Sequence, residues 1–170
     1  MAIEIERKFL LANEAWRAGV HASKRIAQAY LNDTDALASG REHCSVRVRI
    51  SGGSANINIK SRELGASRQE FEYPIPLQDA EQLMVLGCQG LIDKTRHLVR
   101  VGGHLWEIDE FAGDNAGLIV AEIELGHEQE AFDRPAWLGR EVTELLRYYN
   151  MQLSARPYSQ WSDEEKQCGS

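Results

Sequence analysis

The sequence predicts a mostly β protein in which about seven or eight antiparallel strands form either a sandwich or a closed barrel. Three observations predict this class. Short runs alternate apolar and polar residues, which is the two-residue period of a strand. Tight turns such as "SGGS" at 51–54 separate neighbouring runs. The length of 170 residues suits one domain with a sizeable core.

The alternating runs predict the strands in chain order. They occupy 4–10, 25–31, 44–50, 55–61, 69–75, 91–101, 104–112 and 118–126. The runs on either side of "SGGS" are expected to form one hairpin, and those on either side of "GG" at 102–103 a second. The predicted sheet is therefore antiparallel.

A few segments are predicted to lie outside the strands. In 77–86 the apolar residues change to helical spacing, and Gly87 follows, as is typical of a helix end. A short helix at 14–18 and another helix at 140–150 are also expected. The polar segment 33–43 is predicted to be turn-like.

Composition and charge narrow the class of protein. A hydrophobic content of 43% and a charged content of 26% are ordinary for a soluble protein, while a net charge of -7 makes a nucleic-acid partner unexpected. The cysteines Cys44, Cys88 and Cys168 are odd in number and lack CxxC spacing, which argues against a disulfide framework and against structural zinc. Without an apolar run of spanning length or a leader peptide, the sequence predicts a cytoplasmic domain over 1–161 and a polar tail over 162–170.

Charged residues lie two apart in most predicted strands and are sorted by sign. The basic pairs are Arg47 with Arg49 and Lys94 with Arg96; the acidic pairs are Glu70 with Glu72, Glu107 with Asp109, and Glu122 with Glu124; the first strand presents Glu4, Glu6 and Lys8, and the fourth presents Lys60. Any single strand fits a half-solvated sheet that is apolar on one face and polar on the other. Sorting by sign favours instead a barrel whose charged face points inward, so that acidic and basic strands oppose one another.

A charged lumen needs compensation, because unpaired buried charge is costly. A polyanion would compensate the basic strands, and divalent cations would compensate the acidic strands. Carboxylate oxygens suit Mg²⁺ or Mn²⁺. Since a barrel of about eight strands has room for one small ligand, the pattern predicts a metal-complexed polyphosphate as that ligand.

The opening E-x-E-x-K motif, at Glu4, Glu6 and Lys8, resembles the signature of the CYTH superfamily, the triphosphate tunnel metalloenzymes. The similarity continues in order through "SVRVRI", "INIKS", "RQEFEYPI", "LIDKTRH", "WEIDEF", "GLIVAEIEL", "WLGREVTELLRYYN" and "LSARPYSQW". The resemblance implies a closed antiparallel eight-stranded β-barrel that forms a charged tunnel, with a few flanking helices and a C-terminal plug helix at 140–150.

The resemblance also implies roles for individual residues. The residues expected to hold the phosphates are Lys8, Arg47, Arg49, Lys60, Lys94 and Arg96. The residues expected on the metal side are Glu4, Glu6, Glu70, Glu72, Asp109, Glu122 and Glu124. Those expected in catalysis are Glu4, Glu6 and Lys94. Either a second metal ion or a carboxylate such as Glu6 is expected to position water, and Lys94 is expected either to bind phosphate alone or to share in proton transfer as well. The implied cofactor is Mg²⁺ or Mn²⁺.

The implied activity is metal-dependent hydrolysis of a linear triphosphate, with inorganic triphosphate first because the chain resembles the compact bacterial branch of the family. Thiamine triphosphatase, nucleoside triphosphatase and class IV-type adenylate cyclase are the enzymatic alternatives. A polyphosphate-binding module is the alternative without turnover, and metal-dependent phosphate release distinguishes the two. The expected partner is a small-molecule triphosphate, with no nucleic acid and no membrane, and homodimers occur in the family.

Overall fold

The computed structural model describes residues 5–61, 69–87 and 89–167. One antiparallel sheet holds the strands of this part of the chain in the order β5-β4-β3-β2-β6-β7-β8-β1-β9. The strands are β1 (Ile5–Leu11), β2 (Val20–Tyr30), β3 (Cys44–Ser51), β4 (Ser54–Ser61), β5 (Glu70–Ile75), β6 (Gln89–Val101), β7 (His104–Phe111), β8 (Ile119–Leu125) and β9 (Leu138–Glu141). The helical elements are η1 (Ala15–Gly19), α1 (Thr34–Ser39), α2 (Leu77–Leu86), η2 (Gly113–Asn115), η3 (Leu146–Tyr148), α3 (Asn150–Ala155), η4 (Tyr158–Gln160) and α4 (Asp163–Gln167).

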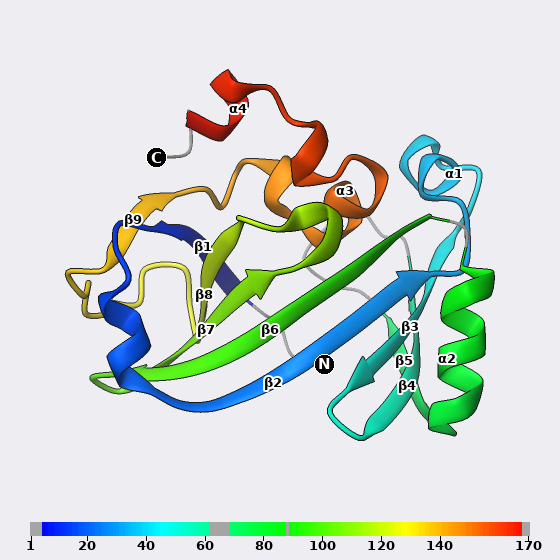
Figure 1. Ribbon diagram of the computed structural model, residues 1–170, viewed down its shortest axis with the longest axis horizontal. Coiled ribbons are helices and arrows are strands. Elements are labelled where there is room, and N and C mark those ends of the chain that lie inside the picture. The colour runs from blue at the N-terminus through cyan, green and yellow to red at the C-terminus, as the bar shows by residue number, and fades with distance from the viewer. Residues whose placement is uncertain (1–4, 62–68, 88, 168–170) are drawn as a thin grey trace.

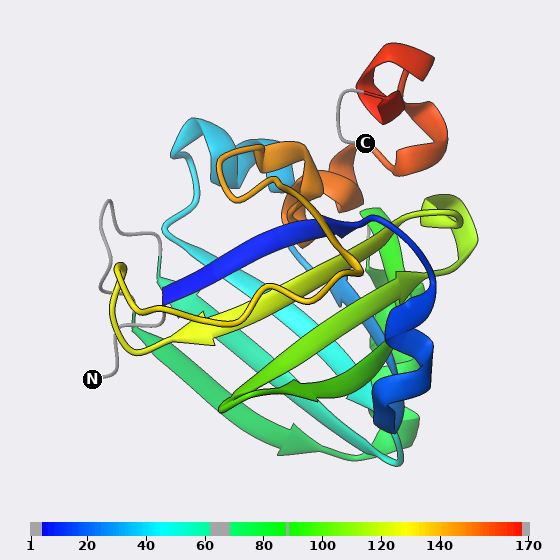
Figure 2. The ribbon, with the colours of Figure 1, turned by 90° about the vertical axis from the view of Figure 1, so that its left-hand side faces the viewer.

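The predicted mostly β, antiparallel class is confirmed, and both predicted hairpins are present as β3–β4 and β6–β7. The sheet is strongly bent. The strands β3, β4 and β5 lie on one side of the central strands β2 and β6, and β7, β8 and β1 lie on the other side (Figures 1 and 2). Closure of an eight-stranded barrel is not confirmed. Within the described residues the sheet has nine strands, and its edges β5 and β9 are not paired with each other.

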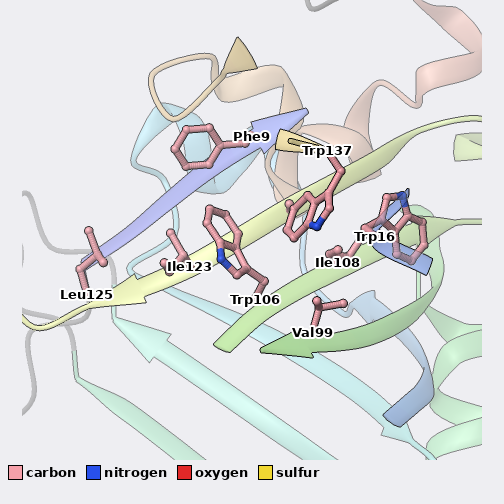
Figure 3. Packing of buried hydrophobic residues seen from close by; sticks show 9 residues of the cluster. Phe9, Trp16, Val99, Trp106, Ile108, Ile123, Leu125 and Trp137 are labelled. Atoms are coloured by element: carbon pink, nitrogen blue, oxygen red, sulfur yellow. The ribbon is translucent and has the colours of Figure 1, made fainter. Parts of the chain in front are cut away.

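An apolar core covers the outer face of β1, β7 and β8 (Figure 3). Phe9, Trp106 and Ile123 lie in this core and are at most 1% exposed. The Trp106 ring meets the rings of Phe9 and Trp137 edge to face, with centroids 5.6 and 5.5 Å apart. Because strand side chains alternate, packing these residues outward turns the residues between them inward.

The helix α2 covers the outer face of β3, β4 and β5 (Figure 1). Ala80 on this helix is fully buried and packs in one cluster with Val48 and Ala55. The limits predicted for this helix, 77–86, are confirmed. None of the helices in the described residues combines the length and the apolarity needed to cross a membrane.

The prediction that 33–43 is turn-like is wrong, because this segment contains α1. The Asp33 side chain caps the helix by accepting a hydrogen bond of 2.9 Å from the Asp35 amide. Gly40 ends the helix with a φ of 83°, a conformation that glycine adopts without steric cost. Leu37 is buried, so packing stabilises a helix that is too short to show a clear period.

The prediction of a helix at 140–150 is also wrong. The segment contains the end of β9 and the single turn η3, and α3 begins only at Asn150. Val142, Leu145 and Tyr148 recur every three residues, and successive tight turns follow that spacing. The Leu145 amide donates to the Val142 carbonyl at 2.9 Å, and the Tyr148 amide donates to the Leu145 carbonyl at 3.1 Å. Such turns present one apolar face as a helix would.

The C-terminal segment, residues 142–161, nevertheless covers one end of the sheet, on the face opposite to the one that packs against the outer core. Tyr148, Leu153 and Trp161 pack in one buried cluster with Ile92 and Phe111, which belong to β6 and β7. Figure 1 shows α3 lying against the inner side of the bent sheet near β6. The predicted plug therefore has a counterpart, although it is made of turns and α3 rather than of one helix over 140–150.

Candidate active site

The strand register brings the predicted charged residues onto one face of the sheet, which we call the inner face. Residues opposite one another in a ladder share a face. Lys8 lies opposite Glu122, and Asp109 lies opposite Arg96. The remaining inner-face pairs are Glu6 with Glu124, Glu107 with Glu122, Gln28 with Arg49, Arg47 with Asn58, Asn58 with Glu72, and Lys60 with Glu70. The alternation read from the sequence therefore gave the correct common face.

Burial along this face changes from one end to the other. Lys94 and Asp109, next to the cluster under the C-terminal segment, are each 1% exposed. Lys8 is 6% exposed, whereas Glu6 and Glu124 are exposed to solvent. The inner face thus runs from an apolar floor, through buried charge, to an acidic mouth.

A buried ion-pair network occupies the deepest charged position. The Lys94 ammonium contacts Asp109 Oδ2 at 2.6 Å, and Arg96 grips the same carboxylate with bonds of 2.8 and 2.9 Å. Arg96 also contacts Glu107 at 2.5 Å. Asn150, at the start of α3, accepts a hydrogen bond from Lys94 at 3.5 Å. Two cations therefore share one fully buried carboxylate.

The electrostatics of this network follow from burial and pairing. Burial alone would raise the pKa of the Asp109 carboxyl, but Lys94 and Arg96 outweigh it and hold that pKa well below its usual value. Burial lowers the pKa of the Lys94 ammonium, and Asp109 opposes the change. Burial likewise raises the pKa of Glu107, and Arg96 opposes it.

Lys8 links the acidic mouth to the C-terminal segment. Its ammonium contacts Glu122 at 2.9 Å and donates to the Tyr148 carbonyl at 3.4 Å. It also lies over the Tyr149 ring, 4.2 Å from the centroid. Burial, with Glu122 and Glu6 nearby, raises the pKa of the Tyr149 hydroxyl, so this ring stays neutral at physiological pH. The segment before α3 therefore holds Lys8 in place from below.

Carboxylates line a cavity of about 340 Å³ at the mouth. Glu6, Glu107, Glu122 and Glu124 contribute to its wall together with His104. These oxygen donors suit a hard divalent cation. Within the described residues, however, no three acidic, histidine or cysteine side chains form a ready-made metal cluster.

The opposite arm of the sheet, formed by β2 to β5, carries a different arrangement. Arg49 donates to the buried Gln28 side chain at 3.2 Å. Asn58 donates to Glu72 at 2.6 Å, and Lys60 lies 3.6 Å from Glu70. Burial, with repulsion from the neighbouring arginines, lowers the pKa of Arg49 to about 10, so Arg49 keeps its charge at neutral pH.

The structure brings most of the predicted site residues onto the inner face. Three residues expected on the metal side do not line the acidic cavity. Asp109 is buried between Lys94 and Arg96. Glu70 and Glu72 lie on the edge strand β5, where they contact Asn58 and Lys60. Glu4 lies outside the described residues.

Sequence reasoning missed three kinds of inner-face residue. Glu107 was part of the charge pattern but was not assigned to the metal side, although it lines the acidic cavity. Gln28 carries no charge and so gave no periodic signal. Tyr149 and Asn150 lay in a segment predicted to be helical, and only the fold shows that they reach Lys8 and Lys94.

Comparison with known proteins agrees with this arrangement. The family model of the CYTH domain matches residues 2–158. A protein of Acetivibrio thermocellus named inorganic triphosphatase is 36% identical over 164 residues, covering 96% of this chain and 100% of that protein. A second inorganic triphosphatase, from Nitrosomonas europaea, is 36% identical over 155 residues, covering 89% of this chain and 96% of that protein.

Solved structures give the same result. The crystal structure of the inorganic triphosphatase NE1496 superimposes with a TM-score of 0.72 at 32% identity, covering 91% of this chain and 95% of that one. A Hippeastrum protein described as a putative adenylyl cyclase with a dominant triphosphatase activity has a TM-score of 0.54 at 18% identity, covering 73% of this chain and 80% of that one, and so shares the fold. The match of the family model, together with these relatives, shows that the chain belongs to the CYTH family.

Proposed function

We propose that this chain hydrolyses inorganic triphosphate to diphosphate and phosphate. The observation that carries the proposal is the inner face, where buried cations lie beside carboxylates that open to a cavity at the mouth. The names of the relatives, which match over nearly the whole chain, support this substrate. A linear triphosphate carries several negative charges, which complement the cations of both arms of the sheet.

The basic residues would bind the phosphate oxygens. Arg47, Arg49 and Lys60 lie on one arm of the sheet, and Lys8, Lys94 and Arg96 lie on the other arm and at its base. The planar guanidinium of an arginine can bind two phosphate oxygens at once, while an ammonium acts as a point charge. Phosphoryl transfer depends mostly on positioning and on electrostatic stabilisation, and a set of fixed cations supplies both.

The acidic residues would hold Mg²⁺ or Mn²⁺ at the mouth. Glu6, Glu107, Glu122 and Glu124 offer hard oxygen ligands around one cavity. Mg²⁺ commonly binds through one or two carboxylates together with substrate phosphates, which suits a site whose described residues form no ready-made cluster. The bound ion would offset negative charge that develops on the phosphate oxygens.

The remaining roles follow from position on the inner face. Glu6 is exposed at the mouth, where it would orient the attacking water toward the triphosphate. Lys94 is buried at the floor, where its ammonium would neutralise the phosphate that lies deepest. Its lowered pKa also suits the part in proton transfer expected from the sequence. The odd number and the spacing of the three cysteines, which argue against a disulfide framework, support a location in the cytoplasm.

Phosphate release tests the proposal. Inorganic triphosphate, ATP and thiamine triphosphate are incubated with the wild type and with Glu122→Gln, each in Mg²⁺, in Mn²⁺ and in chelator. Glu81→Gln is the matched control, because Glu81 is exposed on α2 and away from the inner face. We expect metal-dependent release from inorganic triphosphate that the control retains and that Glu122→Gln loses by about 100-fold or more.

Other outcomes would change the assignment. Faster release from ATP or thiamine triphosphate would reassign the substrate. Binding of inorganic triphosphate without any release, in folded protein supplied with metal, would favour a polyphosphate-binding module. Equal rates of phosphate release by Glu122→Gln and Glu81→Gln would show that the carboxylates of the acidic mouth take no part in the reaction.

A further inference from the structure

The basic residues of the inner face fall into two groups according to their partners. Lys8, Lys60, Lys94 and Arg96 each form an ion pair with a carboxylate of the protein. Arg47 and Arg49 form no ion pair with any described residue. Among the basic residues expected to hold phosphate, the two without an ion-pair partner in the described part of the chain therefore both lie on β3.

Gln28 stands beside this uncompensated charge. It lies in the middle of β2, is 0% exposed, and is opposite Arg49 in the ladder with β3. Its Oε1 accepts a hydrogen bond of 3.2 Å from Arg49 Nε. Its Nε2 is buried and has no hydrogen-bond partner among the described residues. An unpaired buried amide donor is unfavourable, so stability of the ligand-free fold does not account for a glutamine here.

A second unpaired donor lies next to it. Arg47 Nε is also buried without a partner in the described part of the chain, and Arg47 lies opposite Tyr30, two residues from Gln28 along β2. Asn58 lies opposite Arg47 on β4, but its side-chain amide already donates a hydrogen bond to Glu72. Two unused donors and two unpaired guanidinium groups on one stretch of the inner face fit a ligand that offers several acceptor oxygens and negative charge, which is a phosphate group.

We propose that Gln28 is a positioning residue for Arg49 and that Gln28, Arg47 and Arg49 form an anchor that binds one phosphate group of the triphosphate without metal. The assignment rests on the function proposed above and adds a division of the site into two halves. In the anchor, the oxygen of the Gln28 amide fixes the Arg49 guanidinium against repulsion from Arg47, and its nitrogen donates to the phosphate. In the other half, phosphate must first displace a carboxylate from Lys8, Lys94 or Arg96.

Binding of inorganic triphosphate in chelator tests the anchor. Affinity is measured by titration calorimetry for the wild type, Gln28→Leu and Gln28→Glu. Gln82→Leu is the control, because Gln82 is exposed on α2. We expect Gln28→Leu to weaken metal-free binding about tenfold, the effect of losing hydrogen bonds to charged groups. Gln28→Glu is expected to weaken it further, by about 100-fold, because the new carboxylate would pair with Arg49 and repel the phosphate.

The kinetics supply a readout that loss of structure would not imitate. In metal, Gln28→Leu should raise KM for inorganic triphosphate about tenfold while kcat changes by less than about threefold, because the anchor binds substrate and transition state alike. Thermal melting confirms that each variant is folded. If Gln28→Leu does not fold, the metal-free affinity of Gln28→Glu tests the anchor instead. This variant keeps the size of the side chain and the oxygen that accepts from Arg49.

Several results would overturn the anchor. Metal-free affinity of folded Gln28→Glu equal to that of the wild type would do so, as would a fall in kcat at unchanged KM in Gln28→Leu. A wild type that hydrolyses inorganic triphosphate but does not bind it in chelator would overturn the anchor and leave the proposed function in place. A wild type that neither binds nor hydrolyses it would refute the proposed function, and the anchor with it.

Discussion

Asp109→Asn tests whether the buried charges of the inner face stabilise one another before any ligand arrives. The substitution keeps the shape of the side chain and removes its charge. Lys94 then loses its carboxylate partner in a fully buried position, while Arg96 keeps Glu107. Removing one partner of a buried pair costs about 3–5 kcal/mol of the free energy of unfolding. At about 2–4 °C per kcal/mol for a chain of this length, Tm should fall by roughly 10 °C.

The pH dependence of stability gives the same test a second measure. Because the pKa of Asp109 is held below its unfolded value of about 3.9, its contribution is complete above that value. The contribution is lost as the pH falls through the lowered folded pKa. The difference in unfolding free energy between wild type and Asp109→Asn should therefore be largest near neutral pH and should shrink below about pH 4.

Urea denaturation at a series of pH values measures this difference. The matched control is Asp93→Asn on the neighbouring strand β6. Asp93 forms a similar two-bond pair, at 3.0 and 2.8 Å, with Arg25, whose side chain is 72% exposed. Breaking that surface pair should cost less than about 1 kcal/mol. Equal losses in Asp93→Asn and Asp109→Asn at neutral pH would refute the reasoning, because burial would then add nothing to the interaction.

Further predictions concern the site and the two cores. Lys8→Met should reduce kcat/KM for inorganic triphosphate by about 100-fold or more, measured by phosphate release; activity within about threefold of the wild type would remove Lys8 from substrate binding. Trp106→Ala, in the outer core, should lower the free energy of unfolding by about 3–5 kcal/mol in urea denaturation. Leu153→Ala, in the buried cluster at the floor of the site, should lower the free energy of unfolding by about 2–5 kcal/mol. Leu86→Ala, at a side chain that is 72% exposed, should lower it by less than about 0.5 kcal/mol. Similar losses in the two variants would contradict the packing described for α3.

The strands could be predicted because each has one apolar face. Every predicted run overlaps a strand of the sheet, and the limits of α2 agree with the prediction. The strand β9 gave no such signal, since it has four residues and pairs with β1 only at its ends around an irregularity in register. After β9, the apolar residues Val142, Leu145 and Tyr148 recur every three residues, which led to the wrong prediction of a helix at 140–150. One sequence alone does not distinguish a helix from successive turns with that spacing.

The candidate site was predictable as a face but not as a set of pairs. Charges two residues apart place Arg47 with Arg49 or Glu122 with Glu124 on one side of a strand whatever the partner strand is. The pairing of a given cation with a given carboxylate depends on the register between strands, many of which are distant in the sequence. The alternation of residues within one strand does not predict that register. Gln28 was missed for a related reason: its importance lies in its position opposite Arg49, which only the ladder of β2 and β3 reveals.

The distribution of apolar and charged residues explains why a charged inner face is tolerated. The largest apolar cluster and the cluster under α2 pack on the outer face, and an apolar cluster covers only one end of the inner face, so the rest of the inner face is free to carry charge. Where that charge is buried, as at Lys94 and Asp109, the protein neutralises it internally. Arg47 and Arg49 form no ion pair with a described carboxylate, and Gln28 holds the Arg49 guanidinium in place by accepting its hydrogen bond. Ligand binding would therefore relieve repulsion between Arg47 and Arg49 on one arm of the sheet and exchange the ion-pair partners of Lys8, Lys94 and Arg96 on the other.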